Sequence, residues 1–290
     1  MQTTIKKPVK VSGVGLHTGC QVSLVLQPAP EDTGIVFRRL DLQNFQIEAL
    51  RKRVSRVVLA TTLMKKGVML STVEHILSAL YGLGLDNVYI DIDSLEVPIM
   101  DGSALPFVEM VGQAGIQEQN KERTFLKIQE PICLKDNGKF ISIEPASSFQ
   151  ISYEIDFTHP MIGHQVLDLE ITSESYKREI AFARTFGFYT EVEDLRKKGL
   201  IRGGSFDNAV VLSETEIMNG ELRSPDEFVR HKMLDLIGDI SLCGYPLVGH
   251  VRAYKAGHAL HTDLATTLVR NPSLCCHVSE SKLTSQAVNF

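Results

Sequence analysis

Apolar residues in the first half of the chain recur with two different periods. In "QVSLVLQPA" every second residue from Val22 to Leu26 is apolar, which predicts a half-buried strand. Two more strands are predicted around a turn at residues 65–67. The period then becomes helical from Thr72 to about Leu83, and a second helix is predicted from Ser103 to Gly115. Further predicted strands are "GIVFRRL", "FQIEAL" and "NVYIDID".

The second half restarts with strands after a polar stretch without periodicity, "QEQNKER" at residues 117–123, which we interpret as a linker. A hairpin is predicted around Asn137–Gly138. The longest helix is predicted from Pro225 to Leu242, with Ser224 as N-cap and Glu227 as its capping-box partner. The other predicted strands are "FLKIQ", "FQISYEIDF", "NAVVL" and "GHVRAYK", and the other helices are "ESYKREIAFA", "EVEDLRKKG" and "HALHTDLATTL".

Two of the predicted helices resemble each other. "TVEHILSALYGLGL" and "FVRHKMLDLIGDISL" share Val, His and Leu at matched offsets, and each precedes a strand. We therefore predict two related α+β domains, residues 1–116 and 124–270, with a small-molecule site at their interface. Residues 271–290 are expected to form a tail.

Composition narrows the class of protein. The chain has 290 residues, which suits two domains better than one. A net charge of −5 without a basic block argues against a nucleic-acid partner. We expect neither a signal peptide nor a transmembrane segment, because the N-terminus and the rest of the chain lack the apolar runs that these need. Five cysteines without a C-x-x-C pair favour the cytoplasm, and nothing indicates an obligate protein partner.

The longest helix carries the first candidate chemistry. His231, Asp235 and Asp239 recur every four residues and therefore form one narrow polar stripe. A solvated stripe with His–Asp pairs is the simpler interpretation. Alternatively, His231 and Asp235 converge on a metal ion, and His75 supplies the third ligand that a catalytic zinc needs.

The stretch "STVEH" offers two roles for Glu74. Ser71-x-x-Glu74 before an apolar run is the capping-box pattern. Beside a metal ligand at position 75, however, Glu74 would take a proton from the attacking water. The two interpretations make opposite predictions. A capping Glu74 folds back onto Ser71, whereas a base points toward the metal site and leaves Ser71 to cap alone.

Other histidines and a threonine remain open. His258, in "AYKAGHALH", is a candidate acid for a leaving amine, with Asp239 raising its pKa, or else a helix N-terminal loop residue. His261 is its rival, with simple exposure as the alternative. Thr185, in "ARTFGF", either bonds an oxyanion or caps a helix. The glycines around His17 in "SGVGLHTG" indicate a tight turn rather than a phosphate loop.

Ordered stretches from about residue 2 to 268 resemble the UDP-3-O-acyl-N-acetylglucosamine deacetylases of lipid A biosynthesis. They are "SGVGLHTG", "TVEHILSALYGLGLDN", "VPIMDGSALPFV", "RTFGF", "GGSFDNAVVL", "RHKMLDLIGD" and "GHVRAYKAGHALH". The resemblance implies a zinc-dependent amidase of the bacterial cytoplasm, with Fe²⁺ as an alternative ion, that removes acetate from a UDP-linked, acylated glucosamine. It also implies two similar α+β domains, each layering helices on a mostly antiparallel sheet, and a small βαβ insert at about residues 187–212.

The resemblance assigns roles to individual residues. It makes His75, His231 and Asp235 the zinc ligands. Glu74 becomes the general base, and the remaining matches surround the reacting amide or the substrate. These are His258 as the acid with Asp239 behind it, Thr185 for the oxyanion, Lys232 for the site and the phosphates, Asp156, Phe157 and Phe186 for other substrate contacts, and Ile201, Val210 and Val211 for the acyl passage.

Two other functions fit the same residues. One is a metal amidohydrolase that acts on another acylated amine, which a test on the UDP-free sugar would distinguish. The other is a non-catalytic binder of nucleotide sugars with structural histidines, which metal content would distinguish.

Overall fold

The first half of the chain builds a five-stranded sheet with the order β2-β3-β9-β4-β5. The computed structural model describes residues 1–197 and 199–287. The alternation in β3 is confirmed, because Val22, Leu24 and Leu26 are all buried. The strands of this sheet are β2 (Val9–Val14), β3 (Gln21–Pro28), β4 (Ile35–Arg39), β5 (Phe45–Glu48) and β9 (Val88–Ile92).

A small three-stranded sheet follows, formed by β6 (Val54–Arg56), β7 (Thr62–Lys65) and β8 (Val68–Leu70). The turn between β7 and β8 uses Lys66 and Gly67 at positive φ, as predicted for this hairpin. β1 (Thr3–Ile5) pairs antiparallel with β10 (Ile116–Glu118), so part of the expected linker is a strand. The division into domains on either side of residues 117–123 stays a prediction.

The second half builds a seven-stranded sheet around β18, which pairs with β11, β13 and β14. Asn137 and Gly138 have φ of 46° and 77°, the left-handed pair that a two-residue type I′ hairpin requires. The strands are β11 (Thr124–Ile128), β12 (Ile132–Asp136), β13 (Lys139–Glu144), β14 (Phe149–Asp156), β15 (His164–Glu170), β18 (Leu247–Tyr254) and β19 (Cys275–Ser279).

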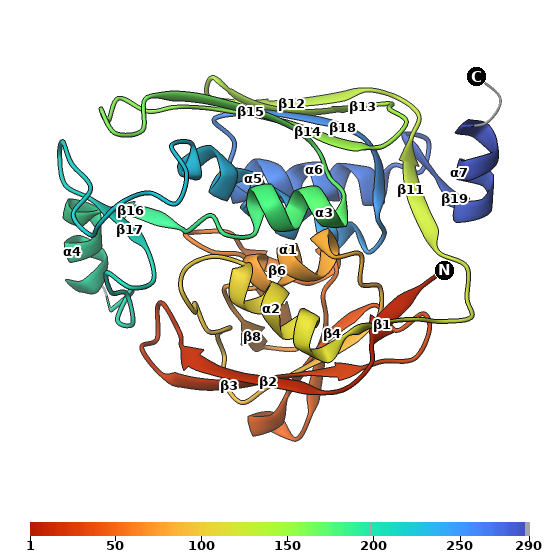
Figure 1. The fold of residues 1–290 in the computed structure, drawn as a ribbon, viewed down its shortest axis with the longest axis horizontal. Helices are drawn as coiled ribbons and strands as arrows, with labels where there is room; N and C mark the ends of the chain where they lie inside the picture. Colours follow the sequence, from red (N-terminus) through yellow and green to blue (C-terminus); the bar gives the residue numbers. More distant parts are fainter. Residues whose placement is uncertain (198, 288–290) are drawn as a thin grey trace.

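The central helices lie between the two large sheets, so the molecule is a mixed α+β protein in layers (Figure 1). Buried apolar side chains from both halves form a continuous core within these layers. The helices are α1 (Glu74–Gly82), α2 (Leu105–Ala114), α3 (Ser173–Ser175) with a π-helical turn at Tyr176–Ile180, α4 (Tyr189–Lys197), α5 (Glu227–Ile240), α6 (His258–Arg270) and α7 (Glu280–Ala287). Short 3₁₀ turns occupy Leu40–Leu42, Arg51–Arg53 and Ser241–Cys243. Among the described residues, no helix has the length and apolar character needed to cross a bilayer.

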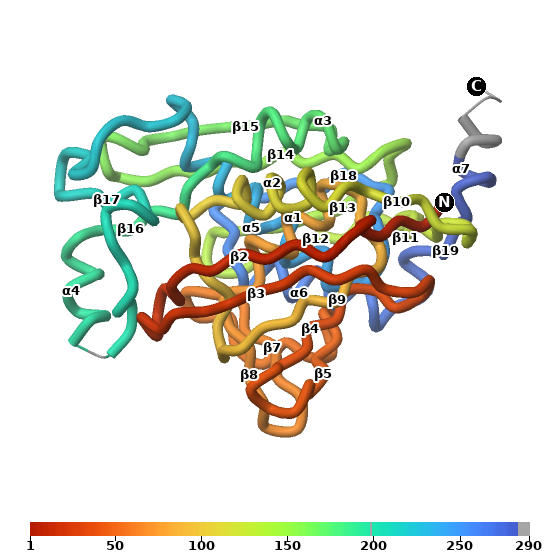
Figure 2. The backbone as a smooth tube through the Cα atoms, turned by 60° about the horizontal axis from the view of Figure 1, so that its bottom comes forward, coloured from red at the N-terminus to blue at the C-terminus, as the bar shows by residue number. Residues whose placement is uncertain are grey.

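The expected βαβ unit is present. β16 (Phe186–Phe188) and β17 (Val210–Leu212) pair in parallel, and α4 connects them. Figure 2 shows this unit projecting at one end of the molecule, far from the C-terminus.

α1 and α5 pack against each other at very close range. A Cβ added to Gly238 would lie 2.2 Å from the backbone oxygen of Glu74. Only glycine therefore permits this crossing without a shift of one helix. The crossing brings the start of α1 beside the middle of α5.

The residues after Arg270 do not form the expected tail. β19 pairs antiparallel with all of β11, and α7 follows it. The pairing satisfies backbone groups that β11 would otherwise expose at the edge of the sheet. "CCHVS" lacks the alternation that would have predicted a strand. Residues 288–290 of the expected tail lie outside the described residues.

Candidate metal centre

The polar stripe of α5 is buried, so the solvated interpretation is wrong. The side chains of His231, Asp235 and Asp239 are only 2%, 3% and 0% exposed. α5 is covered by α1 and α6, which bring His75 and His258 to the same region. Buried charges need partners or a metal ion.

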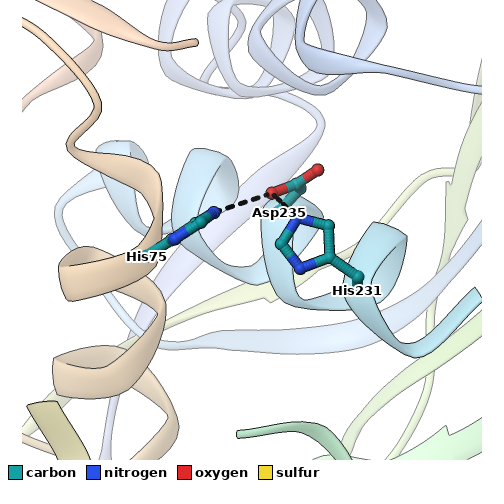
Figure 3. Close-up of side chains that lie close together, drawn as sticks. All are labelled: His75, His231 and Asp235. Atoms are coloured by element: carbon teal, nitrogen blue, oxygen red, sulfur yellow. Dashed lines mark ion pairs between the residues drawn. The ribbon is translucent and has the colours of Figure 1, made fainter. Parts of the chain in front are cut away.

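Three side chains converge from the two helices. Figure 3 shows His75 of α1 pointing toward His231 and Asp235 of α5. The Nε2 atoms of His75 and His231 lie 3.8 Å and 3.4 Å from Asp235 Oδ1, beyond hydrogen-bond distance. Tetrahedral zinc with bonds of about 2.0–2.1 Å would separate its ligand atoms by roughly 3.3 Å. The spacing therefore fits an ion better than direct hydrogen bonds.

The orientation of His231 also suits a ligand. Its Nδ1 lies 3.0 Å from the carbonyl oxygen of Ala183, which can only accept, so Nδ1 carries the proton. Nε2 is then left to face Asp235. A hydrogen bond of this kind commonly orients metal-binding histidines. Nδ1 of His75 is buried and has no hydrogen-bond partner among the described residues.

The protonation states match those that a metal requires. Burial, reinforced by His231, lowers the pKa of His75 to about 3. Burial also lowers the pKa of His231. Burial would raise the pKa of the Asp235 carboxyl, but the charge of Lys232, together with the neighbouring histidines, holds it well below its ordinary value. At neutral pH the three groups are thus two neutral imidazoles and one carboxylate, ready to bind a cation.

Glu74 does not take part in a capping box. α1 begins at Glu74 itself, after Val73, and has no side-chain cap. The Glu74 Oε2 atom accepts from the backbone N–H of Thr61 at 3.0 Å. Ser71 Oγ instead pairs with Thr62 Oγ1 at 3.0 Å, so the expectation that Ser71 caps the helix is wrong. The box fails because Glu74 is the first residue of α1, whereas the pattern needs the glutamate at the third helical position.

Glu74 lies among charged neighbours. Burial raises its pKa to about 7, with His258 acting in the opposite direction and Asp235 and Asp239 adding to the rise. A carboxyl group with this pKa exchanges a proton readily near neutrality, which is the property of a general base.

His258 faces Glu74 and the triad from the start of α6. Its Nδ1 lies 2.7 Å from Asp239 Oδ2, and its Nε2 lies 4.0 Å from Asp235 Oδ2. Burial would lower the pKa of His258, but the carboxylates of Asp239 and Asp235 raise it to about 9. The ring is therefore protonated at neutral pH.

Two further residues complete this network. His261, for which exposure was the alternative, is 0% exposed, and its Nδ1 lies 2.9 Å from Asp239 Oδ2. Thr61 Oγ1 donates to Asp239 Oδ1 at 2.6 Å, and sequence reasoning missed it. The i, i+3 spacing from His258 could have indicated His261. Thr61 lies in a loop and gives no such signal.

The predicted substrate residues fall into two groups. Lys232 Nζ lies 2.7 Å from Asp235 Oδ2 and over the ring of Phe186. Phe186 in turn contacts the rings of His231 and Phe157, so this group adjoins the metal cluster.

The second group is less directly connected. Asp156 pairs with Lys255 Nζ at 2.8 Å. Thr185 is not at a helix end, so it is not a cap; its backbone bonds Gly102 and Val210 beside β16. Ile201 is half-buried, whereas Val210 and Val211 are buried in β17. The lining roles of these three stay predictions.

The turn around His17 is held by Glu96. The Glu96 carboxylate accepts from the backbone N–H groups of His17 and Thr18 at 2.8 Å and 2.9 Å. A Cβ on Gly15 would lie 2.5 Å from this carboxylate. The segment is therefore the tight turn that its glycines predict.

A cavity of about 620 Å³ lies elsewhere, between the end of α1 and the start of β11. Its lining includes Arg123 and Asn87 but no residue of the histidine cluster. Arg123 Nε is paired with Asp86, and Asn87 Nδ2 with Gln2, each at 2.8 Å. These polar groups satisfy one another.

Comparisons with known proteins agree with one another. A family model for UDP-3-O-acyl N-acetylglycosamine deacetylase matches residues 2–270. A UDP-3-O-acyl-N-acetylglucosamine deacetylase of Solibacter usitatus is 48% identical over 98% of this chain and 97% of its own length. Proteins with the same name from Myxococcus xanthus and Teredinibacter turnerae are also 48% identical, over 94% and 93% of this chain and 87% and 90% of their own lengths.

Proposed function

The chain belongs to the UDP-3-O-acyl-N-acetylglucosamine deacetylase family, and from this premise we propose that it hydrolyses the N-acetyl group of UDP-3-O-(3-hydroxyacyl)-N-acetylglucosamine. The products are acetate and the free glucosamine amine, at an early step of lipid A biosynthesis in the bacterial cytoplasm. The observation that carries the proposal is the buried His75–His231–Asp235 cluster with a base candidate and an acid candidate beside it.

Zinc is the ion that we propose for the cluster, with Fe²⁺ as the alternative in the cell. Two neutral imidazoles and one carboxylate make a three-residue ligand set that suits catalytic zinc. When bound, the ion supplies a Lewis acid for the amide carbonyl and lowers the pKa of a bound water.

Glu74 acts as the general base in this proposal. One of its carboxylate oxygens is held by the backbone N–H of Thr61, so the group has a fixed position. It takes a proton from the water that attacks the acetamide carbonyl. Thr185 assists the developing oxyanion.

His258 acts as the general acid. Its Nδ1–H is directed to Asp239, which leaves the Nε2 proton for the departing amine. A leaving amine must be protonated, and a histidine that stays charged at neutral pH can supply the proton.

Substrate contacts complete the proposal. Lys232 supports the site and the phosphates, and the aromatic pair Phe157–Phe186 lies beside the cluster. Asp156 is proposed for the nucleotide side, and Ile201, Val210 and Val211 for the acyl passage.

Metal analysis together with an acetate-release assay on the UDP-linked substrate tests the proposal. We expect one zinc per chain and turnover. Asp235→Asn should lose the metal and at least about 10³-fold in kcat, since Lewis-acid stabilisation is worth several kcal/mol. Asp168→Asn, on the outer strand β15, is the matched control and should keep both. Absence of stoichiometric metal would favour a nucleotide-sugar binder. Equal turnover of the UDP-free sugar would favour an amidohydrolase of another substrate.

A further inference from the structure

Asp239 has more hydrogen-bond partners than its role behind His258 requires. His258 Nδ1 and His261 Nδ1 lie 2.7 Å and 2.9 Å from the same oxygen, Oδ2. Thr61 Oγ1 lies 2.6 Å from the other oxygen, Oδ1. The carboxylate is fully buried, so these contacts determine its position.

The contacts also determine where the ring protons are. An ionised carboxylate can only accept hydrogen bonds, so both histidines present Nδ1–H to Asp239. His258 then directs Nε2 toward the metal cluster, where its distance to Asp235 Oδ2 is 4.0 Å. His261 directs its own Nε2 the opposite way, toward Tyr153.

Tyr153 anchors the far end of this chain of contacts. Its hydroxyl oxygen lies 3.0 Å from His261 Nε2 and 2.8 Å from the carbonyl oxygen of Ala256. Tyr153 lies on β14 and is fully buried. A rigid strand is thereby connected through α6 and α5 to the ring of His258.

We propose that His261 is a positioning residue for the reaction, which holds Asp239 Oδ2 in the one place where it orients the imidazole of His258. Without His261, Oδ2 loses one of its two donors and the link to Tyr153. The Asp239 carboxylate is then fixed mainly by the hydrogen bond from Thr61 to Oδ1, and Oδ2 is free to change position. As a result, His258 Nε2 points at the leaving amine for a smaller fraction of the time. This inference rests on the proposed function of His258 as the acid.

Three substitutions separate the two ends of the His261 ring. His261→Asn keeps an N–H near the Nδ1 position, His261→Gln keeps a polar group near Nε2, and His261→Leu removes both. Losing an outer hydrogen bond that orients a metal-binding residue typically costs 10–100-fold in activity, and we take the same range for the ring of His258. We expect kcat to fall about 10–100-fold in His261→Leu and His261→Gln, with KM and zinc content unchanged. His261→Asn should recover most of the rate.

His250→Leu is the matched control. His250 is a partly buried histidine whose Nε2 lies 2.8 Å from Ser152 Oγ, but it lies in the sheet on β18. Its substitution should leave kcat unchanged. A purely structural role for His261 predicts something different: lower thermal stability in His261→Leu, with kcat per folded, zinc-loaded molecule within about twofold of wild type. That result would overturn the proposal.

Proton NMR of the ¹⁵N-histidine-labelled, zinc-loaded protein gives a readout independent of turnover. Nδ1–H protons bonded to a buried carboxylate resonate far downfield, and wild type should show two. His261→Asn should remove one and leave that of His258 in place, whereas His261→Leu should shift or broaden it. An unchanged His258 signal in His261→Leu contradicts the proposal. If wild type released no acetate, the proposed function would fail while these signals still tested the contact.

Tyr153→Phe serves if His261→Leu does not fold. It removes a single oxygen and should lower kcat several-fold, and the His258 signal should shift or broaden as expected for His261→Leu. If both kcat and that signal match wild type, the connection to β14 does not position His258.

Discussion

The starts of α1 and α5 carry the same local pattern, Ser-x-x-Glu, yet their glutamates have opposite environments. Glu227 accepts from the backbone and guanidinium N–H groups of Arg184 and from the N–H of Arg223, at 2.7–3.0 Å. The Glu74 carboxylate accepts from one backbone donor among the described residues, the N–H of Thr61, and otherwise faces ionisable groups. Both carboxyl groups are buried.

Electrostatics reflects this difference. Burial would raise the pKa of Glu227, but the Arg184 guanidinium holds it below its ordinary value. Burial raises the pKa of Glu74 to about 7, because His258 opposes the rise only in part and Asp235 and Asp239 add to it. A buried carboxylate saturated with donors stabilises the fold, whereas one with few donors retains the capacity to accept a proton. The comparison predicts that the same substitution has opposite consequences at the two positions.

The largest effect is expected for Glu74→Gln. The amide cannot accept a proton, so kcat should fall about 10²–10⁴-fold, the usual contribution of a general base. Zinc content should stay at the wild-type level, and thermal stability should not decrease, because a neutral amide is easier to bury than a carboxylate. Steady-state kinetics and metal analysis on the same preparation measure this. Activity near that of wild type would remove Glu74 from the mechanism.

Glu227→Gln should have the opposite effect, lowering stability while leaving the rate of the folded enzyme unchanged. Removing one partner of a buried ion pair costs about 3–5 kcal/mol, so the free energy of unfolding should fall by that amount. The kcat per folded molecule should stay close to wild type, because the described hydrogen bonds of the Glu227 carboxylate go to Arg184 and Arg223 and not to the histidine cluster. Denaturant unfolding measures the first quantity. A stable but inactive variant would show that the two glutamates are not functionally separate.

The pH dependence gives the smallest and most graded effect. Glu74 must be ionised and His258 protonated, so the rate should fall as pH decreases through about 7 and as it increases through about 9. A bound cation lowers the pKa values of both groups, so the acidic and basic sides of the pH–rate profile should lie at or below pH 7 and pH 9. The contribution of Glu227 to stability, in contrast, is present above its ordinary pKa of 4.5 and is lost only as pH falls through its lower folded value. Activity should therefore decline over a range of pH where this contribution is intact, and circular dichroism alongside the rate profile would test the separation.

Local sequence patterns predicted turns well, but they failed where a side chain's partner comes from a distant part of the chain. The turns at Lys66–Gly67 and Asn137–Gly138 were predicted from Gly67, Asn137 and Gly138, which are residue types that tolerate positive φ. Both capping boxes were wrong, because each helix begins at the glutamate itself, and the two carboxylates instead accept from Thr61 and Arg184. A short sequence pattern contains no information about a partner that lies on another helix, strand or loop.

The site shows the same division. Helical spacing predicted that His231 and Asp235 share a face, and the similarity of two helices predicted that His75 would join them. β15 and β19 were not predicted, because the backbone groups that pair with them lie on β14 and β11. Thr61 was missed for the same reason. The catalytic roles themselves stay predictions until the variants are measured.

The close crossing at Gly238 matters to anyone who would transplant this centre into another protein. Grafting the three ligand residues onto two helices of ordinary separation would leave the imidazole of the first helix out of reach of the second. The unit that must be transferred is the pair of helices together with the glycine at their crossing, Gly238, which has no side chain. A designer would need to keep this glycine as well as the three residues that bind the ion.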